Sequence, residues 1–214
     1  MKLCLIKARA IYEPGGYGGA DGLLVVTPYY NKCTQAGLIA HYTAAADTLP
    51  CPVIVYNVPS RTGVDVSVET CRVLAGHPNI GGIKEASGDM SYAMKIARCV
   101  GPDFALYSGN DDITVPILSI GGSGVISVYA NVMPAMCHQI VDDYLHGRQD
   151  QAVANHLKYL QLMNDLFLEV NPIPVKTAMN LLGLNVGPMR LPLCEMSEAN
   201  AAVLRATMEE AGLL

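Results

Sequence analysis

The chain has 214 residues, a net charge of −5 and 51% hydrophobic residues, which suffices for one well-packed core with an appended region. Lysine and arginine residues are scattered along this mildly acidic chain, which argues against a nucleic-acid-binding surface. No stretch approaches the ~20 consecutive apolar residues of a membrane-spanning helix, and residues 1–10 lack the long apolar core of a signal peptide.

Strand-like and helix-like segments alternate over the first 147 residues. Apolar runs that predict strands cover residues 23–30, 52–59, 80–87, 104–111 and 124–131. Segments that predict helices follow them at residues 36–49, 67–76, 91–101, 112–122 and 133–147. The strand segments are continuous apolar runs, which is typical of parallel strands buried on both faces. The sequence therefore predicts an α/β fold with about five βα units.

The residues after 147 have a different character. Helical patterns cover residues 149–169, 173–183 and 198–212, and no strand-like run separates them. We therefore expect a C-terminal helical domain over residues 148–214, following a βα domain over residues 1–147.

Two architectures fit the βα domain, a doubly wound sheet and a (β/α)8 barrel. A doubly wound sheet usually has a glycine-rich phosphate loop, and neither GxGxxG nor GxxxxGK occurs here. In a barrel, the chemistry gathers at the C-terminal ends of the strands. The polar residues that fall at such ends are Thr27, Tyr29, Tyr30, Tyr56, Lys84, Ser108 and Ser127.

The numbers and spacing of the cysteines and histidines indicate the redox state of the thiols and whether to expect a metal site. The seven cysteines are odd in number, form no CxxC pair and lie mostly in apolar runs, which indicates reduced thiols of a cytoplasmic protein. The five histidines are dispersed without HxxxH spacing, so we expect no metal site.

Lys84 closes the apolar run "IGGIK" and has the most distinctive chemistry. A neutral lysine amine attacks a carbonyl carbon to form an imine, and burial at an apolar strand end disfavours the competing ammonium form. The glycines before it let a ligand or backbone approach closely. The alternative is a side chain that extends from the strand end into solvent, and the pattern leaves both open.

Other residues near strand ends fit the same chemistry. Tyr56 is placed to act as a general acid and base, or it fills the core. Arg61, in the loop that follows, can donate two parallel hydrogen bonds to a substrate carboxylate, or it is a solvated cation. Gly109 leaves backbone groups open to a ligand, or it makes a turn. The pair Tyr29 and Tyr30 packs at a strand end or at an interface.

Six motifs identify a family. They are "VTPYYNK" at 26–32, "YNVPSRTG" at 56–63, "GIKEASGD" at 82–89, "SGNDD" at 108–112, "GGSGVISV" at 121–128 and "NPIPVK" at 171–176. In order and spacing they resemble the dihydrodipicolinate synthase family, also called the 4-hydroxy-tetrahydrodipicolinate synthases, from about Gly19 to Leu214. The resemblance implies a (β/α)8 TIM barrel followed by a C-terminal helical domain. It also implies a lyase that condenses pyruvate with L-aspartate semialdehyde, on the route to lysine and diaminopimelate, without a cofactor.

The resemblance also assigns roles to residues. Lys84 is similar to the Schiff-base lysine and Tyr56 to the proton-relay tyrosine beside it. Tyr30 is similar to the tyrosine that completes the relay from a neighbouring subunit, which implies a homo-oligomer, either a dimer or a tetramer. Arg61 resembles the arginine that holds the semialdehyde carboxylate. Two further positions, Gly109 and Ile126, resemble residues that line the pyruvate pocket.

The chain departs from the family before residue 23. A barrel of this type runs to about 250 residues, and three βα units of the family have no counterpart here. Their "GTTGE"-like loop, which supplies a threonine of the relay and donors to the pyruvate carboxylate, is missing with them. Residues 1–18 fit poorly, because Pro14, Gly15 and Gly16 would break the helix that the family has there. We therefore expect a partial barrel over residues 1–147 with an atypical segment at 1–18.

An incomplete barrel exposes two sheet edges, one at 23–26 and one at 124–128. Exposed edges favour pairing with another chain, so we expect an obligate oligomer or a poorly soluble chain. Three functions remain open: an active synthase, a weakly active or non-catalytic paralogue with a structural role, and another pyruvate-dependent aldolase such as N-acetylneuraminate lyase. Arg61 favours the synthase, because the related lyases keep the tyrosine and the lysine but usually lack "SRTG".

Overall fold

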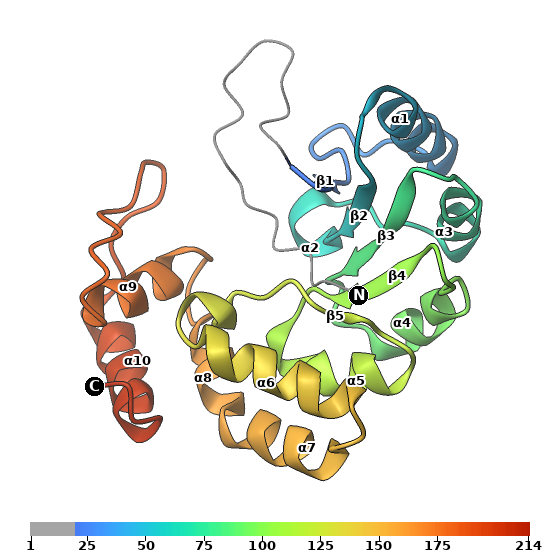
Figure 1. Cartoon of the computed structure of the whole chain (residues 1–214). Helices are drawn as coiled ribbons and strands as arrows, with labels where there is room; N and C mark the ends of the chain where they lie inside the picture. The colour runs from blue at the N-terminus through green and yellow to red at the C-terminus, as the bar shows by residue number, and fades with distance from the viewer. Residues whose placement is uncertain (1–19) are drawn as a thin grey trace. The chain divides into compact units, whose positions relative to one another are not determined.

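The computed structural model describes residues 20–214, so the atypical segment expected at 1–18 lies outside the described residues. The chain divides into two compact units (Figure 1). Unit 1 holds the described residues up to Gly109 together with Ile120–Ser123, and unit 2 holds Asn110–Ser119 and Gly124–Leu214. The boundary at residue 147 between a barrel and a helical domain stays a prediction.

Four parallel strands form the sheet of unit 1. They are β1 (Leu23–Val26), β2 (Val53–Asn57), β3 (Ile80–Glu85) and β4 (Ala105–Ser108). Each strand pairs in parallel with the next one in the chain. The helices of this unit are α1 (Gln35–Thr48), α2 (Pro59–Thr62), α3 (Val68–Ala75) and α4 (Met90–Ala97). The expected α/β fold with parallel βα units is confirmed.

Polar side chains fix the starts of the long helices. The Thr34 hydroxyl accepts a hydrogen bond from the amide of Gly37 at the start of α1. At the start of α4, Asp89 accepts from two amides, those of Ser91 and Tyr92. Such caps satisfy amides that have no partner within the helix. Helices α1, α3 and α4 then lie along one side of the sheet (Figure 1).

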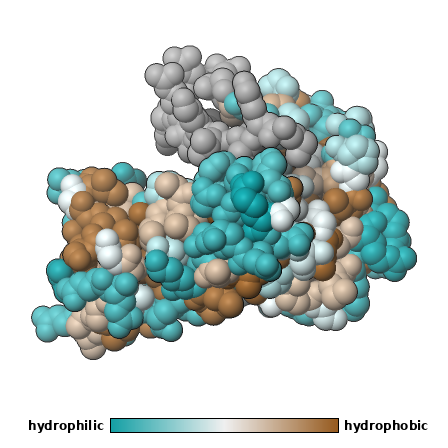
Figure 2. All heavy atoms as spheres, turned by 60° about the horizontal axis from the view of Figure 1, so that its bottom comes forward, coloured by the Kyte–Doolittle hydropathy of each residue, from teal (hydrophilic) through white to brown (hydrophobic). Residues whose placement is uncertain are grey.

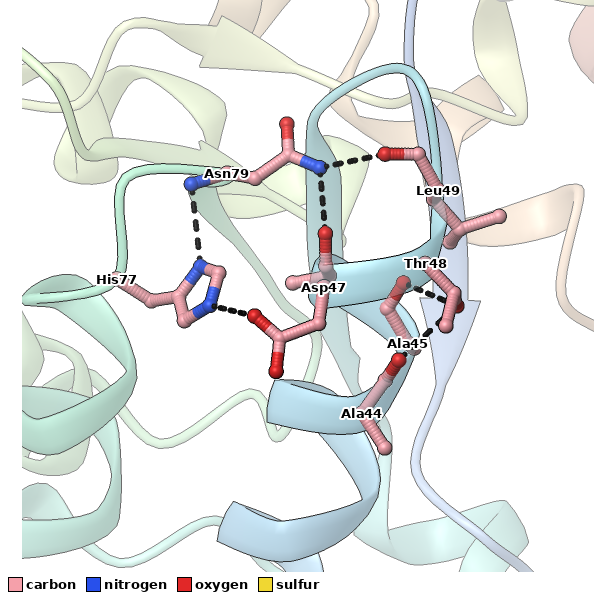
Figure 3. A network of polar contacts seen from close by, with 8 residues as sticks. Ala44, Ala45, Asp47, Thr48, Leu49, His77 and Asn79 are labelled. Carbon is pink, nitrogen blue, oxygen red and sulfur yellow. Dashed lines mark hydrogen bonds and ion pairs between the residues drawn. The ribbon is translucent and has the colours of Figure 1, made fainter.

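A second polar network lies where the chain enters β3 (Figure 3). The side-chain amide of Asn79 donates to the carbonyls of Ala46 (2.8 Å) and Leu49 (3.0 Å) at the end of α1. The backbone amide of Asn79 donates to Nδ1 of His77, whose Nε2 lies 3.1 Å from Oδ1 of Asp47. The network therefore satisfies the C-terminal carbonyls of α1 at the N-terminal ends of the strands.

The strand-like runs are shorter as strands than expected. Strand β1 stops at Val26, and the chain then turns through Tyr30, whose φ is +73°. Positive φ is uncommon for a residue that carries a Cβ. The expected strand at 124–131 is wrong in its second half, because β5 (Gly124–Val125) is short and Tyr129–Asn131 forms the 3₁₀ helix η2. Apolar content alone did not distinguish the two conformations.

Unit 2 is mostly helical. It contains η1 (Asp111–Ile113), α5 (Thr114–Ser119), β5, η2, α6 (Pro134–Leu145), α7 (Gln149–Lys158), α8 (Leu160–Asp165), α9 (Ile173–Leu181) and α10 (Glu198–Glu210). Its core is apolar and includes the fully buried side chains of Leu166, Leu204 and Met208. The C-terminal helical region expected after residue 147 is confirmed, since no strand occurs among the described residues there.

The surface is a mixture of hydrophilic and hydrophobic patches on the face that Figure 2 shows. The most exposed large apolar side chains include Tyr30 (93%), Leu191 (92%) and Tyr29 (67%). None of the helices in the described part of the chain is long and apolar enough to cross a membrane.

Candidate active site

Lys84 and Tyr56 lie side by side at the C-terminal ends of two strands. They are partners in the register of β2 and β3, so both side chains leave the same face of the sheet. Lys84 is only 8% exposed, and its Nζ lies over the ring of Tyr56, 4.3 Å from the ring centroid. Of the two alternatives for Lys84, the structure contradicts extension into solvent.

Two opposing influences act on the Lys84 amine. Burial disfavours the ammonium form, whereas the electron-rich face of the Tyr56 ring favours a cation. The contact also restricts the rotamers of a long, flexible side chain. The ring of Tyr56 therefore holds the amine at the strand end, whether the amine is charged or neutral.

Tyr56 is in turn influenced by Arg61. Burial raises the pKa of the Tyr56 hydroxyl, and the charge of the nearby Arg61 guanidinium offsets part of that rise. The hydroxyl therefore stays protonated at neutral pH. Arg61 itself is exposed in the last turn of α2, directly after β2 (Figure 1). The structure brings together Lys84, Tyr56 and Arg61, which can bind and protonate an anionic carbonyl compound.

A short, well-anchored loop carries Arg61. Helix α2 ends at Gly63, whose φ of +68° favours glycine. The buried hydroxyl of Thr62 accepts a hydrogen bond of 3.0 Å from Thr27, the residue after β1. This hydrogen bond ties the loop between β2 and α3 to the C-terminal end of β1.

Gly109 directly follows β4, where the chain passes very close to the residues after β3. Its amide donates to the carbonyl of Glu85 at 2.6 Å, so this donor is already used within the sheet. A Cβ at this position would lie 2.4 Å from the Cβ of Ala86. Close packing of β3 against β4 therefore explains the glycine, and its assignment to a pyruvate pocket stays a prediction.

We expect Gly109→Ala to destabilise unit 1 by about 1–3 kcal/mol, because the added methyl overpacks β3 against β4. Urea unfolding followed by circular dichroism measures the change. Gly101→Ala is the matched control, since a Cβ at Gly101 has no neighbour within 4 Å, and it should change the free energy of unfolding by less than about 0.5 kcal/mol. Equal stability of the two variants would contradict the packing explanation.

Tyr30 and Ile126 are the two remaining predicted site residues. Tyr30 is 93% exposed. Ile126 follows β5 in unit 2 and is half-buried. Ser127, which the sequence placed at a strand end, accepts a hydrogen bond from the amide of Ala130 and so shapes the local turn. The roles of Tyr30 and Ile126 stay predictions.

The sequence analysis missed two buried polar residues next to the site. Asn57 ends β2 and Glu85 ends β3, each one residue after Tyr56 and Lys84. Both are buried, and a hydrogen bond of 2.7 Å joins Nδ2 of Asn57 to Oε2 of Glu85. A polar residue in the last position of two adjacent apolar strands was the signal that could have revealed them.

No cluster of three or more histidine, cysteine, aspartate or glutamate residues suited to a metal ion occurs within residues 20–214. The reactive groups that the structure places at this site are the Lys84 amine, the Tyr56 phenol and the Arg61 guanidinium.

Comparisons with known proteins agree with these features. The model of the dihydrodipicolinate synthetase family matches residues 13–211. A 4-hydroxy-tetrahydrodipicolinate synthase of Thermoanaerobacter sp. (strain X514) is 53% identical over 197 residues, which cover 92% of this chain and 66% of that protein. The corresponding protein of Clostridium perfringens (strain SM101) is 50% identical and covered to 67%. The chain thus spans about two thirds of the length of the curated relatives that it matches.

Solved structures give the same result. The dihydrodipicolinate synthase of Thermotoga maritima superposes with a TM-score of 0.89 at 44% identity, covering 92% of this chain and 68% of that one. The enzyme of Acinetobacter baumannii, solved in complex with pyruvate, has a TM-score of 0.88 at 42% identity, covering 92% and 67%. The chain therefore has the α/β fold of these proteins over the part that it shares with them.

Proposed function

The chain belongs to the dihydrodipicolinate synthetase family, and we propose that it forms an imine between Lys84 and pyruvate in a class I, aldolase-type lyase reaction. The observation that supports this most directly is the buried Lys84 amine, 4.3 Å from the Tyr56 ring centroid at the end of β3. The amine attacks the keto carbon of pyruvate, and the carbinolamine loses water to give the imine.

The second half of the proposed reaction consumes L-aspartate semialdehyde, the substrate that the family resemblance implies. The imine loses a methyl proton to become an enamine, whose carbon attacks the aldehyde carbon of the semialdehyde. Tyr56 moves protons to and from the oxygen atoms, and Arg61 binds the semialdehyde carboxylate through paired hydrogen bonds. We place this reaction in lysine and diaminopimelate biosynthesis in the cytoplasm.

A coupled assay separates the alternatives. The wild-type chain is incubated with pyruvate and L-aspartate semialdehyde, and the loss of both is followed; a parallel incubation offers N-acetylneuraminate for cleavage. We expect equimolar loss of pyruvate and semialdehyde and no cleavage. Cleavage without condensation would identify another pyruvate-dependent aldolase, and neither reaction in folded protein would favour a non-catalytic paralogue.

We further propose that Tyr30 acts in the site of a second copy of the chain. Its 93% exposure in the isolated chain supports a role at an interface between copies. Tyr30→Phe and Lys84→Met variants should each be inactive alone. When they are mixed and allowed to exchange subunits, some sites combine an intact Tyr30 from one chain with an intact Lys84 from another. We expect partial recovery of condensation in the mixture, and no recovery would place Tyr30 outside the shared site.

A further inference from the structure

Asn57 and Glu85 form a pair on the opposite face of the sheet from the proposed imine site. They are register partners one position after Tyr56 and Lys84, and successive side chains of a strand point to opposite faces. Glu85 faces α3 and α4, where its charge adds to the effect of burial in raising the pKa values of Cys71 and Tyr92. The Asn57–Glu85 pair therefore lies behind the site and does not face a substrate there.

Hydrogen bonds use both groups of the Asn57–Glu85 pair. Nδ2 of Asn57 donates to Oε2 of Glu85 and to Oδ1 of Asp65, both at 2.7 Å. Oδ1 of Asn57 accepts from the amide of Val66 at 3.1 Å, and Oε1 of Glu85 accepts from the amide of Ser87 at 2.6 Å. The amide of Val66 fixes the orientation of the Asn57 carboxamide, because only its oxygen can accept that bond.

These bonds close the loop that carries Arg61. Asn57 precedes the loop and Asp65 and Val66 end it, so one side chain joins both ends of residues 58–66. Burial raises the pKa of Glu85, so ionising this carboxylate in the folded protein costs free energy. An apolar pair of similar volume avoids that cost, but it cannot tie the loop ends to β3.

We propose that the Asn57–Glu85 pair is a positioning device that holds the loop at 58–66, so that Arg61 meets the carboxylate of the aldehyde substrate beside Lys84. This inference rests on the proposed function, since it gives the pair a role in binding the second substrate only. The imine step with pyruvate takes place on the other face of the sheet and does not use the pair. The pair should therefore control binding of the anionic aldehyde and leave imine formation unchanged.

Glu85→Gln tests the proposal, because it replaces one of the two acceptor oxygens at this position by an NH₂ donor. In either orientation the new donor faces another donor, the side-chain amide of Asn57 or the backbone amide of Ser87, and one hydrogen bond is lost. We expect the KM for L-aspartate semialdehyde to rise about tenfold or more, the effect of one broken buried hydrogen bond. The rate of borohydride-trapped imine formation with pyruvate should change less than about threefold. Hydrogen exchange at residues 58–66 should also become faster.

A triple variant supplies the rescue. It combines Asn57→Asp, Asp65→Asn and Glu85→Gln, which reverses the direction of the side-chain hydrogen bonds. Position 57 then accepts from positions 65 and 85 instead of donating to them. The bonds from the Val66 and Ser87 amides remain possible. If the pair acts through geometry, this variant should recover most of the lost affinity for the semialdehyde and the slow exchange of the loop. Asn79→Ala is the control, because it breaks two side-chain hydrogen bonds at the opposite ends of the strands (Figure 3).

These measurements test the positioning role of the Asn57–Glu85 pair separately from the proposed function. An unchanged KM and unchanged loop exchange in Glu85→Gln would overturn the inference, as would an equal rise in KM in Asn79→Ala. A fall in imine trapping that matches the loss of affinity would show a general structural defect and overturn it too. Wild-type protein that traps no pyruvate would refute the proposed function and this inference together, whereas a normal wild-type adduct with no effect of Glu85→Gln refutes the inference alone.

Discussion

We expect Lys84→Met to abolish the borohydride-stable pyruvate adduct that the proposed function predicts for the wild-type chain. Methionine has nearly the length of lysine and fills the same space over Tyr56, so the fold should persist while the nucleophile is lost. Intact-mass spectrometry after reduction should show the mass of one reduced pyruvyl group on the wild-type chain and none on the variant. Condensation with the semialdehyde should fall to the background rate.

Lys158 provides the matched control for Lys84. Its Nζ lies 5.0 Å from the ring centroid of Tyr159, so it is also a lysine over a tyrosine ring, but it is exposed on α7. Lys158→Met should form as much adduct as the wild-type chain. If Lys84→Met kept the adduct, or if both variants lost it equally, burial at the end of β3 would not select the reactive amine.

Tyr56→Phe should lower the turnover of condensation by about 10²–10⁴-fold, the usual contribution of general acid–base catalysis. The substitution keeps the ring that contacts Lys84 and removes only the hydroxyl, whose pKa is raised by burial. The pyruvate adduct should still form, more slowly, because an amine and a keto acid combine without the phenol. Steady-state kinetics and the time course of trapping measure the two effects separately.

Tyr42→Phe is the control for loss of a buried tyrosine hydroxyl. The Tyr42 hydroxyl, carried by α1, donates to the carbonyl of Val25 at 3.0 Å and also bonds to the backbone of Tyr56. Its loss should cost stability of the order of 1 kcal/mol and leave turnover unchanged. A similar loss of turnover in both variants would indicate a structural effect and contradict a proton-relay role for Tyr56.

The sequence was sufficient to predict the elements with strong periodicity and the pairing of the site strands. Continuous apolar runs predicted parallel strands, and the position of Tyr56 and Lys84 at the ends of two such runs predicted that they would be neighbours. This worked because parallel strands align their C-terminal ends at one edge of a sheet. The position of Arg61 in the loop after Tyr56 indicated a binding residue, and its charge lowers the pKa of the Tyr56 hydroxyl against the effect of burial; its role toward a carboxylate stays a prediction.

Features set by tertiary packing could not be predicted in this way. Tyr30 looked like a strand end but lies in a turn with positive φ, because apolar composition does not report backbone conformation. Gly109 looked like an opening for a ligand or a turn, although its lack of a Cβ is required by Ala86, the residue after β3. The Asn57–Glu85 pair was missed because its partners, Asp65 and Val66, lie across a loop in the sequence.

Peptide mapping of the trapped adduct shows which lysine reacts with pyruvate. The wild-type chain is reduced with borohydride in limiting pyruvate, digested, and sequenced by mass spectrometry. We predict one reduced pyruvyl group per chain, on the peptide that contains Lys84, with little at the exposed Lys95 and Lys158. Modification spread over the exposed lysines, or an unmodified Lys84 in folded protein, would contradict it.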